Sequence, residues 1–300
     1  DLLIGDGVAN VLRGGLGADT LLGLAGNDTL WGGAGAGNTL QGELGDDTYV
    51  LESADSITEF TGEGTDTVDA RINTYVLANN VERLVFGGTG NFAGTGNALA
   101  NILTGGAGND TLRGRGGIDV LNGGLGVDTA DYTLAAAGVV ARIDLQRATN
   151  DGDGATDTYT GIENLIGSNF NDTLIGDNNA NVLMGGIGQD ILLGFGGNDI
   201  LMGGSGGINN QLQGGTGDDW YILEAFDTCV EFAGEGIDTI EAKVGTYTLG
   251  NHVENLLYTG PGKFVGNGNT LDNIITGGAL DDVLRGKGGN DTIYGGTGMD

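Results

Sequence analysis

Acidic side chains recur every nine residues along much of this chain, within the pattern Gly-Gly-x-Gly-x-Asp-x-U-x, where U is a large apolar residue. Residues 14–22 have this pattern, and residues 23–31 repeat it. Carboxylates beside a glycine-rich backbone are oxygen ligands, so these positions are suited to binding a hard cation. A single motif would fit an ordinary turn equally well, because aspartate forms local hydrogen bonds in turns. Twenty such positions in one register favour the cation.

The sixth position of each repeat holds the candidate ligand, and these positions fall into two series. They are Asp1, Asn10, Asp19, Asp28, Asn38, Asp47, Asn101, Asp110, Asp119 and Asp128, followed by Asp172, Asn181, Asp190, Asp199, Asn210, Asp219, Asn273, Asp282, Asp291 and Asp300. Calcium accepts about six to eight oxygen ligands in a flexible cage, whereas magnesium prefers a rigid octahedron. Soft metals are poorly served by a chain with one cysteine and one histidine. The sequence therefore predicts several calcium ions.

Each nonapeptide is predicted to form one turn and one short strand. Its first six residues are turn formers, and its last three, such as residues 20–22, contain one inward apolar residue. Two consecutive nonapeptides would complete one coil, so stacked coils would build two parallel sheets around a thin core. Residues 18 apart, such as Asp1 and Asp19 or Asp282 and Asp300, would then lie on adjacent coils. The predicted fold class is all-β, a parallel β-roll or β-helix solenoid with calcium in the turns.

Composition excludes several classes of protein. The chain has 64 glycines but one proline, which excludes collagen. Its formal net charge of -30 implies self-repulsion unless cations are bound, and it lacks the clustered basic residues that nucleic acid requires. We expect no membrane span, because no apolar stretch is long enough. The single cysteine, Cys229, excludes an internal disulfide, so metal is expected to stabilise the fold and the metal-free chain to be largely disordered.

The two series are copies of each other, which predicts a tandem duplication. Asp19 aligns with Asp190 at an offset of 171, and Asp47 aligns with Asp219 at 172, because one residue is inserted near Ile208. We predict a first module at 1–128, a connector at 129–171 and a second module at 172–300. Because the chain opens and stops inside a repeat, we expect it to be a piece of a longer protein.

The nonapeptide resembles the calcium-binding repeat of the RTX family, and the resemblance covers nearly the whole chain. It implies a β-roll that binds calcium through sixth-position side chains and turn carbonyls. It also implies secretion through a type I exporter and folding in calcium-rich extracellular medium. By position, the implied ligands are Asp1, Asp19, Asp28, Asp47, Asp110, Asp119, Asp128, Asp172, Asp190, Asp199, Asp219, Asp282, Asp291 and Asp300.

Two further groups of residues depart from the repeat. The stretches 51–93 and 224–265 resemble a degenerate continuation of the coil, in which Asp66 and Asp238 are expected as extra ligands. A neutral oxygen occupies the ligand position at Asn10, Asn38, Asn101, Asn181, Asn210 and Asn273. These asparagine turns are expected to be the weaker sites.

Catalytic chemistry finds little support in the residues. The one histidine, His252, aligns with Asn80 of the other copy, so neither a zinc protease site nor a duplicated serine triad can form. Cys229 aligns with Ile57 and is expected to be a buried apolar residue rather than a nucleophile. Tyr49 and Tyr221 align at the U position and are expected in the core. We therefore expect no enzyme activity from this chain.

The leading hypothesis for function is a calcium-binding structural region of a secreted or cell-surface protein. An adhesin stalk, a surface-layer subunit and a surface filament all fit, with other copies of the chain or surface glycans as partners. The alternative is a carbohydrate-binding or export-and-folding module of an extracellular polysaccharide-modifying enzyme or toxin. Arg113 and Arg285 occupy matching positions in the two copies, so a weak glycan-binding strip formed by basic residues is a further alternative.

Overall fold

Short strands and glycine-rich turns alternate along the computed structural model, which describes residues 1–35, 37–204, 209–224 and 227–300. The described residues contain no helix, and hence none that could span a membrane. Contacts divide the chain into two compact units. Unit 1 comprises residues 1–132 and 146–162, and unit 2 comprises residues 133–145 and 163–300. The predicted module boundaries remain a prediction, because this division uses residues of the segment 129–171 in both units.

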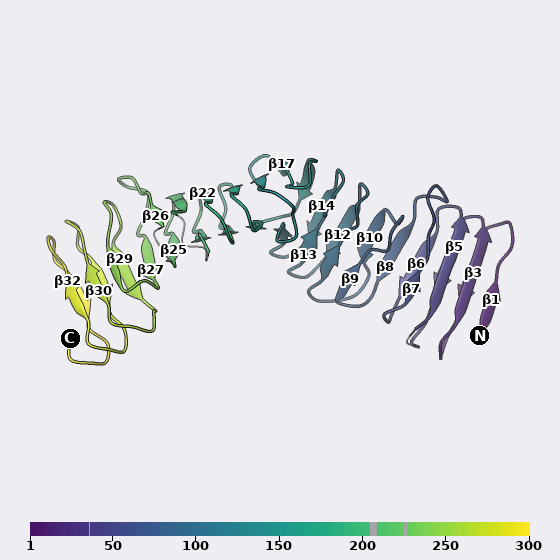
Figure 1. Ribbon diagram of the computed structural model, residues 1–300, viewed down its shortest axis with the longest axis horizontal. Helices are drawn as coiled ribbons and strands as arrows, with labels where there is room; N and C mark the ends of the chain where they lie inside the picture. The colour runs from purple at the N-terminus through teal and green to yellow at the C-terminus, as the bar shows by residue number, and fades with distance from the viewer. Residues whose placement is uncertain (36, 205–208, 225–226) are drawn as a thin grey trace. The chain divides into compact units, whose positions relative to one another are not determined.

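Parallel pairing at a spacing of two nonapeptides builds both units. Strand β1 (Leu2–Ile4) pairs with β3 (Thr20–Ala25) so that Leu2 lies opposite Thr20, 18 residues on. The strand between them in sequence, β2 (Val11–Arg13), pairs instead with β4 (Thr29–Trp31) in another row. Consecutive nonapeptides thus alternate between two rows. Figure 1 shows β1, β3 and β5 side by side in one of these rows. The predicted parallel β-roll is confirmed.

In unit 1, the strands of one face belong to two separate sheets, and the strands of the other face belong to one sheet. The first face has β1, β3, β5 (Thr39–Leu44) and β7 (Ser56–Ile57), then β9 (Thr74–Val76), β11 (Ala93–Thr95), β13 (Thr111–Arg113) and β15 (Thr129–Asp131). The second has β2, β4, β6 (Thr48–Leu51), β8 (Thr67–Ala70), β10 (Arg83–Phe86), β12 (Ile102–Gly106), β14 (Val120–Gly124), β18 (Asp157–Thr160) and β17 (Arg147–Asn150). Strands β17 and β18 are antiparallel.

Unit 2 repeats this arrangement. One face has β16 (Val140–Arg142), β20 (Thr173–Ile175), β22 (Ile191–Gly196), β24 (Gln211–Thr216) and β26 (Thr228–Cys229), then β28 (Thr246–Thr248), β30 (Val265–Asn267) and β32 (Val283–Arg285). The other has β19 (Asn164–Ile166), β21 (Val182–Met184), β23 (Ile200–Met202), β25 (Trp220–Leu223), β27 (Thr239–Ala242), β29 (Asn255–Tyr258), β31 (Ile274–Thr276) and β33 (Thr292–Tyr294). The insertion near Ile208 lies outside the described residues.

The core is a stack of apolar side chains, one from the middle of each regular strand. Leu21, Leu30 and Leu40 are fully buried, whereas both neighbours of Leu30 in β4 are partly exposed. Such alternation is expected when one face of a strand is buried. Several strands are longer than the three residues predicted, because the turn residues that follow also pair with the next coil. In β3, Ala25 lies opposite Leu44 of the next coil.

The degenerate stretches continue the coil with altered lengths. Thr39 pairs with Ser56 at a spacing of 17, Thr67 with Arg83 at 16, and Thr48 with Thr67 at 19. Backbone pairing is therefore maintained where the nine-residue pattern is lost. Glycine is needed where coils approach closely, as at Gly33, whose φ is 90°. A methyl group there would lie 2.3 Å from the carbonyl oxygen of Gly15.

Candidate metal centre

A ladder of hydrogen bonds links the sixth-position residues of successive coils. The backbone N–H of Asp28 donates to Oδ1 of Asp47 at 2.6 Å, and that of Asp110 donates to Oδ1 of Asp128 at 2.7 Å. In unit 2, Asp172 donates in the same way to Asp190 at 2.9 Å. Each rung fixes the side chain on the next coil and occupies one carboxylate oxygen.

The second carboxylate oxygen of many turn aspartates is buried and unpaired. Among the described residues, Oδ2 has no hydrogen-bond partner in Asp19, Asp28, Asp47, Asp110, Asp119, Asp190, Asp199, Asp219 and Asp238. These side chains are at most 3% exposed. Because buried polar atoms are almost always hydrogen-bonded in folded proteins, this repeated exception points to a ligand.

Glycine gives the unpaired oxygen a space to face. A methyl group on Gly14 would lie 2.6 Å from Oδ2 of Asp19 and 2.7 Å from the carbonyl oxygen of Gly32 on the next coil. At Gly185 the corresponding distances are 2.4 Å to Asp190 and 2.7 Å to the carbonyl oxygen of Gly203. Carboxylate and carbonyl oxygens thus converge on a space about the size of one atom. This donor set suits calcium.

Two predicted aspartate ligands are held differently. Oδ2 of Asp172 accepts the backbone N–H of Ser168 at 2.7 Å, and Oδ2 of Asp282 accepts that of Gly278 at 2.5 Å. Both oxygens still lie beside a turn glycine, Gly167 and Gly277. These turns have a charged ligand whose oxygen is already engaged in a local hydrogen bond.

Asparagine turns satisfy their side chains within the protein. Oδ1 of Asn101 accepts the backbone N–H of Asn97 at 2.7 Å, while its amide donates to the carbonyl of Val81 at 3.1 Å. Oδ1 of Asn181 likewise accepts the N–H of Asp177 at 2.8 Å. The same local bond forms at Asn10 and Asn273. A neutral, already bonded oxygen has less to gain from a cation, which supports the expected weakness of these turns.

Burial raises the pKa of many turn carboxyls. It raises the pKa of Asp119 and Asp199 to about 7 and that of Asp190 to about 6, although the ladder N–H groups oppose the shift. Repulsion from Asp157 raises the pKa of Asp119 further. The pKa values rise because a buried carboxylate without a counter-charge is unstable. A bound cation would remove that cost.

The outermost predicted ligands are the least enclosed. Asp1 and Asp300 are exposed and Asp291 is half-buried. Asp300 still accepts the N–H of Asp282 at 3.0 Å, and Asp291 accepts that of Asn273 at 3.0 Å. The ladder therefore extends to these positions.

The structure also places residues in the ladder that the sequence analysis did not select. Asp55 accepts the N–H of Asn38 at 3.3 Å, and its counterpart Asp227 accepts that of Asn210 at 3.2 Å. Asp157 accepts the N–H of Asp119 at 3.0 Å. Asp55 and Asp227 lie outside the nonapeptides, so the nine-residue pattern gave no signal for them. The duplication gave one, because Asp55 and Asp227 occupy matching positions in the two copies.

The structure shows the surroundings of the residues that were considered for catalysis. His252 and Asn80 both have left-handed backbone, with φ of 63° and 62°. Burial raises the pKa of the Cys229 thiol above its usual range, so a reactive thiolate is disfavoured. Tyr49 and Tyr221 are fully buried.

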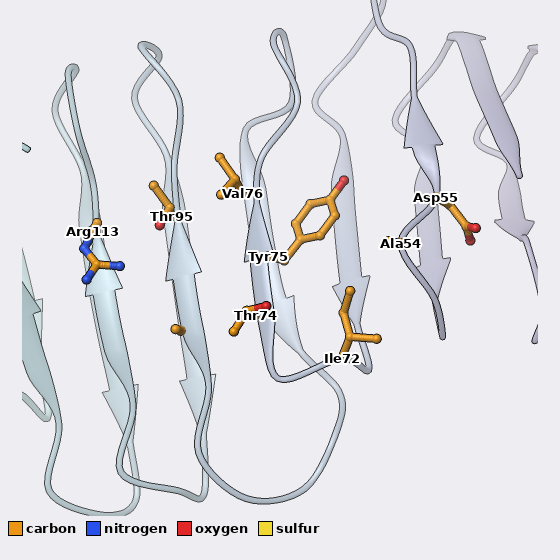
Figure 2. Close-up of a pocket in the computed structure, with 9 residues that line it drawn as sticks. Ala54, Asp55, Ile72, Thr74, Tyr75, Val76, Thr95 and Arg113 are labelled. Atoms are coloured by element: carbon orange, nitrogen blue, oxygen red, sulfur yellow. The ribbon is translucent and has the colours of Figure 1, made fainter. Parts of the chain in front are cut away.

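A pocket of about 360 Å³ lies in unit 1 where β7 and β9 are not paired, next to Arg113. In Figure 2, Tyr75 and Val76 of β9 lie between Asp55 on one side and Thr95 and Arg113 on the other. The guanidinium of Arg113 is paired with Asp131 at 2.5 Å. The arginine is therefore already neutralised within its own unit, which weakens it as an anchor for an acidic glycan.

The fold and the turns together define a class: a β-roll whose successive coils present buried, unpaired carboxylate oxygens at glycine-rich turns. The chain belongs to the RTX calcium-binding nonapeptide repeat family. The family pattern matches residues 4–37, 95–130, 157–192, 175–207, 205–220 and 267–300, which together make up more than half of the chain.

Two relatives are glycanases of Rhizobium meliloti (strain 1021). Endo-1,3-1,4-beta-glycanase ExsH is 46% identical over 77 residues, which cover 25% of this chain and 16% of that protein. Endo-1,3-1,4-beta-glycanase EglC is 40% identical over 85 residues, covering 28% of this chain and 18% of that protein. The chain thus aligns with less than a fifth of either relative.

Proposed function

We propose that this chain is a calcium-dependent structural region of a secreted or cell-surface protein, which folds when it meets calcium after export. The observation that carries the proposal is the series of buried Oδ2 atoms without partners. All of those named above except that of Asp238 lie beside a glycine and, at regular turns such as Gly14, beside a carbonyl oxygen of the next coil. Without a cation these groups repel and destabilise the coil. With one, each turn would cross-link two coils.

The proposed ligands are the predicted ones, in an order of strength that the hydrogen bonds suggest. The strongest are the nonapeptide aspartates with an unpaired Oδ2, followed by Asp172 and Asp282, and then by Asn10, Asn101, Asn181 and Asn273. Asp1, Asp128, Asp291 and Asp300 are ligands by position in the repeat, and Asp66 and Asp238 by position in the ladder. Calcium, when bound, supplies positive charge and no reaction chemistry.

Export through a type I system fits this mechanism. A chain that stays unfolded in calcium-poor cytoplasm could pass an exporter and fold outside, where the ion is abundant. Modules at 1–128 and 172–300, joined by 129–171, would serve as part of an adhesin stalk, a surface layer or a filament. Partners would be further copies of the chain or surface glycans.

The glycanase relatives support a second candidate, a folding or carbohydrate-binding module attached to a polysaccharide-modifying enzyme. The names of ExsH and EglC state an action on 1,3-1,4-beta-linked glycans. Co-sedimentation of the calcium-loaded chain with insoluble mixed-linkage β-glucan tests this directly. Pelleting with the glycan would favour this candidate, and an unbound chain would favour the purely structural region.

Paired substitutions test the calcium assignment. Asp19→Ala removes a buried ligand with an unpaired oxygen, so we expect weaker and less cooperative calcium binding in calorimetric titration. His252→Asn is the control, because Asn80 holds the same left-handed backbone in the other copy. Equal effects of the two substitutions on calcium binding would contradict the proposed roles.

A further inference from the structure

One turn in each copy has a glutamate opposite its turn glycine. In the regular coil, β3 and β5 pair so that Gly23 lies opposite Gly42, whose carbonyl oxygen lies near the space in front of Gly23. One coil further on, Thr39 pairs with Ser56 and Leu40 with Ile57, and this register places Glu59 opposite Gly42. A glutamate therefore occupies the position where the regular coil has a glycine.

The side chain of Glu59 reaches the turn at Gly42. A methyl group on Gly42 would lie 2.0 Å from Oδ2 of Asp47 and 2.5 Å from the hydroxyl of Tyr49. The N–H of Gly42 donates to the Tyr49 hydroxyl at 2.7 Å and to Oε1 of Glu59 at 3.3 Å. The carboxylate and the hydroxyl thus border the space that a calcium ion occupies in a regular turn.

Three carboxylates converge at this point. Asp47, Glu59 and Asp66 each offer one oxygen, and these oxygens lie within 4.8 Å of one another. Asp47 and Asp66 are 1% exposed and Glu59 is 6% exposed. Oδ2 of Asp47 and Oε2 of Glu59 have no hydrogen-bond partner among the described residues. No ion pair in the described part of the chain includes any of the three.

The same site recurs in unit 2. Leu212 pairs with Cys229, which places Glu231 opposite Gly214, and Asp219, Glu231 and Asp238 again lie within 4.8 Å. Oδ2 of Asp219 and Oε2 of Glu231 are buried and lack partners among the described residues. The Tyr221 hydroxyl bonds Glu231 and the N–H of Gly214. Two copies of one buried, uncompensated arrangement indicate a built site rather than chance proximity.

We propose that Glu59 and Glu231 each complete a second type of calcium site, formed by three carboxylates and adjoined by a tyrosine hydroxyl. All ligands of the site are oxygens. Cys229 is close in sequence to Glu231, but Ile57 holds its position in the other copy, so a thiol is not part of the shared ligand set. Hard oxygen ligands on a flexible side chain suit calcium better than zinc or copper. The ion would sit where the regular nonapeptides end and the altered coils begin.

This inference rests on the proposed function in one respect, the use of calcium by the fold, but the glutamates that define the site, Glu59 and Glu231, lie outside the nonapeptide pattern. Native mass spectrometry of the whole chain in calcium counts the ions. We expect Glu59→Gln with Glu231→Gln to bind two ions fewer than the wild type, and either substitution alone to bind one fewer. The matched control is Glu52→Gln with Glu224→Gln, an equal loss of charge at exposed counterpart positions, which should leave the count unchanged.

An unchanged count in the Glu59 and Glu231 variant would overturn the proposal while leaving the regular sites intact. If the proposed function were wrong, the regular turns would not bind calcium. The wild type would then bind no more than the two ions held at Glu59 and Glu231. Crystals of the wild type grown with calcium provide a test that does not depend on the variants. An anomalous scattering peak in contact with Glu59 and Asp47 is expected, and a calcium-loaded crystal without it would refute the site.

Discussion

At the scale of single residues, the turn aspartates with an unpaired Oδ2 divide their two oxygens between two tasks. Oδ1 of Asp47 accepts the backbone N–H of Asp28, while Oδ2 remains unpaired beside Gly42. Asn101 fills the corresponding position with an oxygen that accepts a local N–H and an amide that donates to Val81. Aspartate turns therefore need a cation to satisfy the buried carboxylate, and asparagine turns do not.

Adding one methyl group should block a regular site. Gly14→Ala places a carbon within 2.7 Å of both Oδ2 of Asp19 and the carbonyl oxygen of Gly32, where the ion would bind. We expect the affinity of that turn to fall by about tenfold or more, or about 1.4 kcal/mol, in calorimetric titration. Gly7→Ala is the matched control, since nothing lies within 4 Å of its added methyl and its φ is not left-handed. Equal loss in both variants would show that the space at Gly14 is not a binding space.

Acid should partly replace calcium. Burial raises the pKa of Asp119 and Asp199 from 3.8 to about 7 in the metal-free fold. A raised carboxyl pKa stabilises the fold below pH 3.8, and this contribution is lost as the pH rises through about 7. We expect metal-free protein to gain β-structure by circular dichroism as the pH falls from 8 to about 5, whereas calcium affinity should weaken over the same range. Loss of β-structure on acidification would contradict the assignment.

At the scale of the elements, a single strand is too small to be stable alone. β13 has three residues, of which Leu112 is fully buried and its two neighbours are partly exposed. Its partners are β11 and β15 on adjacent coils, so each strand depends on the coils before and after it. Stability in such a stack is approximately a sum of nearest-neighbour interfaces.

Removal of one core side chain should therefore weaken its own coil and the two adjacent ones. Leu112→Ala is expected to cost about 2–5 kcal/mol of unfolding free energy in the calcium-loaded protein, because the thin core cannot close the cavity. Leu16→Ala serves as the control, since Leu16 is 86% exposed. Urea denaturation in saturating calcium measures the difference. A cost at Leu112 as small as that at Leu16 would mean that the leucine stack contributes little.

The sequence predicted the parallel coil because the nine-residue pattern repeats the same turn and the same inward leucine. It could not place Asp55 and Asp227 in the ladder or Glu59 beside Gly42, because the coil length there changes to 17 residues and the motif is lost. In that region register depends on backbone pairing rather than on motif spacing. Comparison of the two copies would have indicated Glu59, since Glu231 holds the matching position.

At the scale of the whole chain, negative charge governs when the protein can fold. The formal net charge is -30, and the apolar core has one main residue per strand. Self-repulsion and chain entropy oppose folding, and a narrow core offsets only part of them. Each bound calcium ion would neutralise two negative charges and link neighbouring coils. Calcium binding and folding should therefore occur together rather than in sequence.

Circular dichroism during a calcium titration tests this coupling most directly. The account predicts little β-structure in excess chelator at neutral pH, followed by a cooperative rise as calcium is added and a return on re-chelation. Magnesium at the same concentration should not produce the rise, since it requires a rigid octahedral site. A β-signal that is already complete in excess chelator and unchanged by calcium would contradict the account.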